Sequence, residues 1–118
     1  MTIDPSALAE LLEMVGDDSA FVDDIVDTYL RDAPDQVTGM RTALAQGDIE
    51  TLGRHAHTLK GNSLTVGATA LASIARELEE RARAGDSADA GSRIEDASAE
   101  LGRVAITLDA ARLRGWRP

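Results

Sequence analysis

The sequence predicts an all-α protein: an antiparallel up-down four-helix bundle with a short additional helix at its N-terminus. Alanine, the residue with the highest helix propensity, is abundant, whereas proline occurs only three times. Aromatic residues make up 3% of the chain, and the β-branched or aromatic runs that strands need are absent. Apolar residues instead recur at helical spacing in five segments. The short connections between these segments force neighbouring helices to run antiparallel.

Length and charge narrow the classes of function. A chain of 118 residues is long enough for one hydrophobic core, so we expect a single domain over residues 1–118. The net charge of -9 argues against binding to nucleic acid or to an anionic membrane, since both attract a positive surface. The lack of cysteine excludes disulfides, thiolate zinc sites and cysteine nucleophiles. No apolar run is long enough for a membrane span and no signal peptide is evident, so we expect a cytoplasmic protein. We also expect it to be a monomer.

The first two helices have recognisable ends. Asp4 and Pro5 are typical of an N-cap and a first helical position, and Gly16 is expected to end this short helix. The second helix is expected to begin near residues 17–19 and to bury a stripe that includes Phe21 and Tyr29. Pro34 is expected to kink or break this helix before it ends at Gly47.

Three more helices follow. The third is expected at about residues 48–66 and the fourth, its partner in a helical hairpin, at about 69–84. Residues 85–91 read as a loop that includes the start of a fifth helix, whose seam runs from Ile94 to Ala111. The tail over residues 112–118 is expected to be frayed, apart from Trp116, which we expect to dock on the bundle.

The outward face of the third helix carries the strongest functional signal. At about 100° per residue, His57 lies opposite a buried side formed by Ile49, Leu52, Ala56, Leu59 and Ser63. Its neighbours on the outer stripe are Glu50, Gly53, Arg54, Lys60, Gly61 and Leu64. A glycine inside a helix costs about 1 kcal/mol relative to alanine, and a solvent-facing position gives no packing reason for it. Two glycines flanking one histidine therefore indicate a bare surface that lets a macromolecule approach the imidazole.

The chemistry that suits this stripe is phosphoryl transfer. Imidazole is largely neutral, and hence nucleophilic, at cytoplasmic pH. Lys60, the only lysine of the chain, stands one turn away and can offset part of the phosphoryl charge. No metal ligands or general base accompany His57, so we expect no cofactor or metal in this chain. A partner would then supply most of the catalysis.

The third helix and the turn after it resemble the signature of the histidine-containing phosphotransfer (HPt) domain of bacterial and plant phosphorelays. The matching segments are His57-Thr58-Leu59-Lys60-Gly61-Asn62-Ser63 and Gly67-Ala68. The resemblance covers roughly residues 3–85. The other residues placed as in that family are Ile3-Asp4, Phe21, Tyr29-Leu30, Leu44, Gly47-Asp48 and Leu78-Glu79.

The resemblance implies a phosphocarrier rather than an enzyme. In such a protein His57 is phosphorylated, usually through Nε2, and relays phosphate between aspartates of response-regulator receiver domains. Lys60 steadies the phosphoryl oxygens, and Gly61 leaves room for the receiver's phospho-aspartyl pocket with its Mg²⁺. A hybrid histidine kinase is a further implied partner. The chain has no Gly-rich nucleotide loop with which to bind ATP.

Two residues depart from the family pattern. Asn62 stands where a small residue, commonly serine, is usual, which affects the fit of a partner. Glu79 stands where some members use glutamine to hydrogen-bond the histidine. An acid there either orients the imidazole or opposes the phosphate.

Several residues near His57 have two interpretations. Gly53 and Gly61 are assigned to partner access, whereas Arg54, Leu64 and Glu79 are candidate interface residues. Arg54 alternatively forms an i,i+4 pair with Glu50, and Leu64 alternatively belongs to the edge of the core. His55 lies at the edge of the buried side, which favours a structural role. The run over residues 76–81 is most simply a solvated face with local ion pairs.

Two other functions stay open at this point. One is a binding module with the same bundle, which docks onto receivers without carrying phosphate. The other is the phosphate-accepting domain of a histidine kinase, in which ATP is the ultimate donor of the phosphoryl group.

Overall fold

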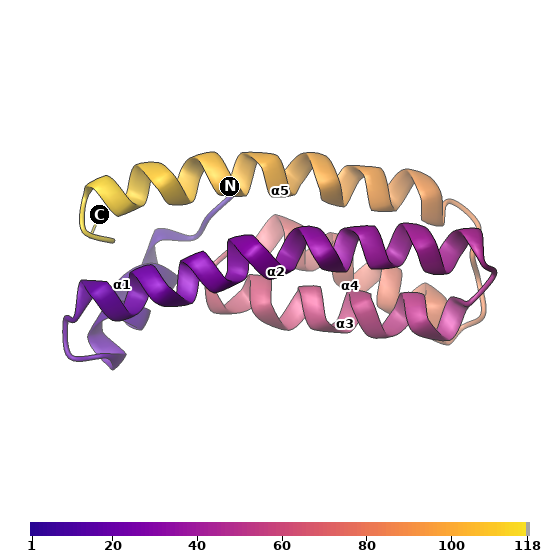
Figure 1. Ribbon diagram of the computed structural model, residues 1–118, viewed down its shortest axis with the longest axis horizontal. Coiled ribbons are helices and arrows are strands. Elements are labelled where there is room, and N and C mark those ends of the chain that lie inside the picture. Colours follow the sequence, from indigo (N-terminus) through magenta and orange to yellow (C-terminus); the bar gives the residue numbers. More distant parts are fainter. Residues whose placement is uncertain (118) are drawn as a thin grey trace.

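The computed structural model describes residues 1–117, and these form five α-helices without a strand. The helices are α1 (Pro5–Met14), α2 (Ser19–Ala45), α3 (Ile49–Thr65), α4 (Thr69–Arg83) and α5 (Ala90–Leu113). Helices α2 to α5 run alternately up and down along the 44 Å length of the molecule (Figure 1). Each of the four packs against two others, so that they form a ring around one core. The predicted all-α four-helix bundle with a short N-terminal helix is confirmed.

Aspartate side chains fix where three of the helices begin. Asp4 accepts a hydrogen bond from the backbone N–H of Ser6 at 3.0 Å, and Asp18 accepts one from Ala20 at 3.1 Å. Asp48 accepts one from Thr51 at 3.1 Å. Each of these contacts satisfies a backbone donor that the first helical turn leaves free, which is typically worth about 1 kcal/mol.

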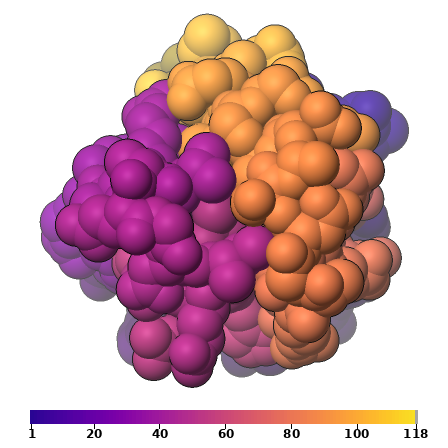
Figure 2. All heavy atoms as spheres, turned by 90° about the vertical axis from the view of Figure 1, so that its right-hand side faces the viewer, coloured from indigo at the N-terminus to yellow at the C-terminus, as the bar shows by residue number. Residues whose placement is uncertain are grey.

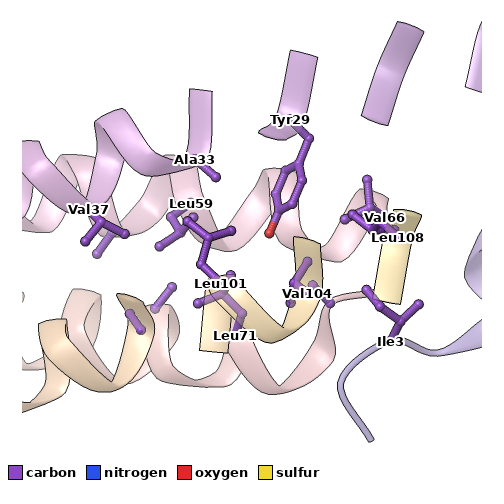
Figure 3. Packing of buried hydrophobic residues seen from close by; sticks show 14 of the residues in the cluster. Ile3, Tyr29, Ala33, Val37, Leu59, Val66, Leu71, Leu101, Val104 and Leu108 are labelled. Carbon is purple, nitrogen blue, oxygen red and sulfur yellow. The ribbon is translucent and has the colours of Figure 1, made fainter. Parts of the chain in front are cut away.

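The core is aliphatic, as the scarcity of aromatic residues predicts. Its largest fully buried aliphatic side chains come from the four long helices and the turn after α3: Met40, Leu52, Leu59, Leu71, Leu78, Ile94, Leu108, Val22, Val26, Val66 and Val104. Tyr29 projects from α2 into this cluster (Figure 3). Its hydroxyl lies 2.9 Å from the hydroxyl of Ser63 on α3, so the one buried phenol has a partner.

Pro34 does not break the second helix. Helix α2 is continuous over 27 residues with the proline inside it. Ala33 and Val37 on either side of Pro34 are both buried in the core. Proline removes one backbone hydrogen bond, and the packing of these two neighbours against the bundle holds the helix together across it. The expected break is therefore wrong.

Phe21 is also placed differently from the prediction. It is 57% exposed, whereas Val22, Val26 and Tyr29 form the buried seam of α2. The seam follows a spacing of four and then three residues, and Phe21 lies one position, or about 100°, away from it. The apolar stripe of α2 is therefore broader than the surface that the neighbouring helices cover, and Phe21 lies on its uncovered edge.

The N-terminal segment holds the turn between α3 and α4. The backbone N–H of Asp4 donates to the carbonyl of Gly67 at 2.8 Å. Gly67 has a φ of +78°, and a Cβ there would lie 2.8 Å from both the Cβ of Ala7 and the carbonyl oxygen of Asp4. Only glycine fits this position. Gly67, in the turn that follows α3, therefore also allows the start of α1 to pack against the bundle.

The opposite end of the bundle is closed by contacts between α2 and α5. Figure 2 shows this end, with the last turns of α2 in magenta beside the start of α5 in orange. Arg41 donates two hydrogen bonds, of 2.8 and 2.7 Å, to the two carboxylate oxygens of Glu95. This bidentate pair joins the two helices where the chain has no direct connection between them.

The C-terminal tail is docked rather than frayed over its described residues. Trp116 is 2% exposed, and its indole N–H donates to Asp23 on α2 at 2.9 Å. The guanidinium of Arg112 lies 5.3 Å from the centre of the indole ring and also pairs with Asp23 and Asp27. The docking of Trp116 is as predicted; Pro118 lies outside the described residues.

We expect Trp116→Ala to lower the free energy of unfolding by about 3–5 kcal/mol, because it removes a large buried side chain. Urea unfolding followed by far-UV circular dichroism measures this change. Leu113→Ala, at a position 90% exposed on the same tail, is the matched control and should leave the midpoint unchanged. Equal midpoints for the two variants would show that the tail does not contribute to the fold.

The single tyrosine allows a direct test of the core. Burial, with the carboxylate of Glu100 nearby, raises the pKa of Tyr29 to about 12. Because the ordinary value is about 10, the contribution of Tyr29 to stability is complete below pH 10. It is lost as the pH rises through 12. Absorbance at 295 nm should therefore titrate near 12 in the folded protein and near 10 in concentrated urea. A folded-state midpoint near 10 would contradict the buried placement.

Candidate functional site

Helix α3 has the two faces that the sequence predicts. Its buried residues are Leu52, Ala56, Leu59 and Ser63. His57 lies near the middle of the helix on the opposite face, and its side chain is 63% exposed. The imidazole is thus open to solvent although it belongs to a helix of the bundle.

A buried carboxylate from α4 holds the exposed ring. His57 Nδ1 lies 2.6 Å from Oε2 of Glu79, and Lys60 Nζ donates to Oε1 of the same carboxylate at 2.6 Å. Arg83, one turn further along α4, donates to Oε2 at 2.8 Å. Glu79 itself is only 3% exposed. One acceptor therefore joins the predicted histidine and lysine and adds an arginine that the sequence analysis did not single out.

The burial of Glu79 corrects the interpretation of residues 76–81 as a solvated face. Glu79 follows Leu78, a core residue, and so borders the buried stripe of α4 on the side that faces α3. A buried carboxylate is stable only when its charge is compensated. The hydrogen bonds from Lys60 and His57, together with the charge of Arg83, hold the pKa of Glu79 below its usual range. Burial alone would raise this pKa.

The ionised carboxylate determines which ring nitrogen of His57 carries the proton. A carboxylate without a proton can only accept hydrogen bonds, so Nδ1 of the neutral imidazole must be the donor. The lone pair of the neutral ring then lies on Nε2. Because the side chain is 63% exposed, this nitrogen is the nucleophilic atom that a partner can reach.

Lys60 has a more constrained position than the sequence suggests. Its side chain is 23% exposed, and its ammonium is bound to Glu79 rather than free in solvent. It still lies on the same side of α3 as His57, at the i+3 position, so the two functional groups share one acceptor.

The two glycines of the outer stripe differ. Gly61 is exposed, and a Cβ added there would meet nothing within 4 Å. Gly53 is half-buried, and a Cβ there would lie 3.1 Å from the Cβ of Ala82 on α4. The expectation that neither glycine has a packing reason is therefore wrong for Gly53, because its missing side chain lets α3 and α4 approach closely.

Gly53 and Ala82 also line a groove beside the imidazole. The α3–α4 groove has a volume of about 620 Å³. Its lining residues are Ile49, Glu50, Gly53, Arg54, His57, Thr58, Glu79, Ala82 and Arg83. The lining combines apolar residues with two arginines, Arg54 and Arg83, and it includes His57, so the nucleophile borders a cleft.

The other predicted residues of α3 make no hydrogen bond to His57, whose partner is Glu79. Arg54 donates to the hydroxyl of Thr51 at 3.1 Å, and no ion pair with Glu50 is formed. Leu64 is 46% exposed, which makes it a surface residue rather than part of the core. Asn62 is exposed on α3.

His55 has the structural role that its position favours. Its Nδ1 lies 2.8 Å from Oε1 of Gln36 on α2. A Cβ at Gly39 would lie 2.5 Å from Nε2 of His55, so the ring packs directly on the backbone of α2. His55 therefore belongs to the α2–α3 contact, away from the groove.

The sequence analysis did not identify Arg83 as a site residue, because its place in the site depends on its hydrogen bond to the buried carboxylate of Glu79. The only local signal is that the two residues are spaced i,i+4 on a helix, which is typical of an exposed ion pair. The family resemblance indicated that Glu79 contacts His57, which the structure shows, but not that its carboxylate is buried and takes a second cation from α4.

Comparisons with known proteins show the family to which the chain belongs. A protein-family model described as the Hpt domain matches residues 24–116. The chain belongs to this family, whose members are phosphocarriers of two-component phosphorelays and not catalytic enzymes. A search of curated proteins gave no match.

A solved structure gives a more particular likeness. The chain is similar to histidine-containing phosphotransfer protein B (HptB) from Pseudomonas aeruginosa PAO1, with 33% sequence identity, a TM-score of 0.86 and 96% of each chain covered. The chain is thus an HptB-like phosphotransfer domain that relays phosphoryl groups.

Among the described residues, no helix is both long and apolar enough to cross a membrane. Within residues 1–117, no three histidine, aspartate or glutamate side chains are grouped so as to hold a metal ion.

The assignment of the imidazole proton is directly testable. We expect nitrogen-detected NMR of the unphosphorylated protein to show the neutral His57 ring protonated at Nδ1. Glu79→Gln should reduce the population of this form, because an amide can donate as well as accept. The signals of His55 serve as the internal control and should not change. Protonation of the wild-type His57 ring at Nε2 would contradict the assignment.

Proposed function

We propose that His57 is the phosphorylated residue of this domain and that Nε2 is the atom that accepts the phosphoryl group. The observation that carries the proposal is the hydrogen bond between Nδ1 and the buried carboxylate of Glu79. It holds the ring in one orientation and leaves the second nitrogen facing solvent. Of the two histidines in the chain, His55 packs against α2, which leaves His57 as the accessible nucleophile.

The proposed donors and acceptors are aspartates of response-regulator receiver domains. In the forward step, Nε2 attacks phosphorus, the bond from phosphorus to the aspartyl oxygen breaks, and the aspartate leaves as a carboxylate. The product ring carries the phosphoryl group on Nε2 and its original proton on Nδ1. In the reverse step the P–N bond breaks, and the neutral Nδ1-protonated ring leaves. No proton is transferred in either direction.

Glu79 has two functions in this scheme. It orients the ring before the reaction, and its negative charge stabilises the positive charge that the imidazole gains when Nε2 binds phosphorus. The alternative that Glu79 opposes the phosphate is less favourable, because Lys60 and Arg83 already compensate its charge. Lys60 is proposed to steady the phosphoryl oxygens as a mobile cation.

The surface around His57 is proposed as the receiver-binding face. Gly61 provides the open approach, since no atom lies where its side chain would be. Arg54 and exposed Leu64 flank the histidine on α3, and Gly53 lines the α3–α4 groove. We propose that the Mg²⁺ required for transfer is supplied by the receiver, where it would neutralise charge on the transferring group. A hybrid histidine kinase is a further proposed partner, and a cytoplasmic monomer is the proposed working form.

Chemical phosphorylation tests the site without a partner. We expect phosphoramidate, a small phosphoryl donor, to give the wild-type protein one phosphoryl group that is labile in acid and stable in alkali. His57→Gln should carry no such label, whereas His55→Gln should be labelled like the wild type. Mass spectrometry under alkaline conditions measures both. Equal labelling of His57→Gln and wild type would contradict the assignment.

A phosphorylated receiver domain from the same organism tests the relay itself. Gly61→Gln should lose transfer from the receiver but keep labelling by phosphoramidate, because the added side chain obstructs a large partner far more than a small phosphoryl donor. A wild-type protein that binds the phosphorylated receiver but acquires no label would instead be a binding module, and the proposed relay would be wrong.

A further inference from the structure

The carboxylate of Glu79 has one more donor than the proposed reaction uses. Lys60 binds Oε1, whereas His57 and Arg83 share Oε2. Glu79 is 3% exposed, while the Arg83 side chain is 71% exposed, so the guanidinium reaches the carboxylate from solvent. Arg83 also lines the α3–α4 groove. The proposed function uses this contact only to compensate the charge of Glu79 and gives it no part in the transfer itself.

Phosphorylation of His57 would create a competition for the ammonium of Lys60. A phosphoryl group on Nε2 carries nearly two negative charges. It would lie next to Lys60, which is one turn further along α3. In the unphosphorylated protein the ammonium of Lys60 lies 2.6 Å from Glu79. Moving it to the phosphoryl oxygens takes a cation away from a buried carboxylate, which is unfavourable unless another cation stays in place.

We infer that Arg83 is a positioning residue whose guanidinium stays on Glu79 and thereby releases Lys60 to the phosphoryl group. The inference rests on the proposed function, because it requires a phosphoryl group on His57. The division of the two oxygens supports it: Lys60 can leave Oε1 while His57 and Arg83 remain on Oε2. The Arg83 contact is an i,i+4 pair within α4, so it does not depend on a movement of α3.

The lifetime of phosphohistidine measures the release of Lys60. The wild type, Arg83→Ala, Lys60→Ala and the double variant are loaded with phosphoramidate, and hydrolysis is followed by phosphorus NMR. Arg83→Ala should shorten the half-life by about three- to tenfold, the effect of losing one partly exposed ion pair. Lys60→Ala should shorten it at least as much.

The double variant separates a role through Lys60 from an independent one. If Arg83 acts by releasing Lys60, the double variant should hydrolyse no faster than Lys60→Ala alone. Arg83→Lys should restore most of the wild-type half-life, because it keeps a cation at the i+4 position. Arg76→Ala, which removes an exposed arginine elsewhere on α4, is the matched control and should behave like the wild type. Circular dichroism confirms that each variant is folded.

Three results would overturn the inference alone: a wild-type half-life for Arg83→Ala, effects of the two alanine substitutions that multiply in the double variant, or an Arg83→Lys variant as short-lived as Arg83→Ala. A wild-type protein that takes no label at His57 would overturn the proposed function and this inference with it. The two failures are therefore distinguishable.

Discussion

The buried carboxylate of Glu79 is the constraint on which the arrangement of this surface depends. It lies between two helices and collects donors from both, with His57 and Lys60 on α3 and Arg83 on α4. A carboxylate that is 3% exposed needs these partners, and they in turn are held in place by it. The result is an imidazole that is open to solvent and yet has a fixed orientation.

The backbone of the α3–α4 hairpin makes this contact possible. At Gly53 the helices approach so closely that a Cβ would lie 3.1 Å from Ala82, and at Gly67 the turn fits against the N-terminal segment with no room for a side chain. The packing of the hairpin thus requires glycine at two points along its length. Between them, Glu79 of one helix can reach His57 of the other, and the α3–α4 groove opens beside the ring.

Much of the fold could be predicted, because its determinants are local. Aspartate caps and helical spacing mark the helices, and the outward position of His57 follows from the buried face of α3 alone. The pairing of α3 with α4 could be predicted, but the burial of Glu79 and the packing of Gly53 could not, since both depend on how closely the two helices approach. The contribution of Arg83 could not be predicted either, because it follows from that burial. Packing between helices also explains Phe21, which belongs to an apolar stripe that the neighbouring helices only partly cover. Continuity through Pro34 likewise comes from packing that the chain acquires only in the bundle.

The single hydrogen bond at Nδ1 has a consequence for the direction of signalling. Under the proposed reaction the ring begins and ends each cycle with the same proton on the same atom, bound to the same carboxylate. Such a carrier does not itself favour one direction of transfer, because the same geometry serves both loading and unloading of the phosphoryl group. The net direction of phosphoryl transfer is then set by the abundance and phosphorylation state of the donor and acceptor receiver domains. If their concentrations were reversed, transfer would run in the opposite direction through the same binding surface.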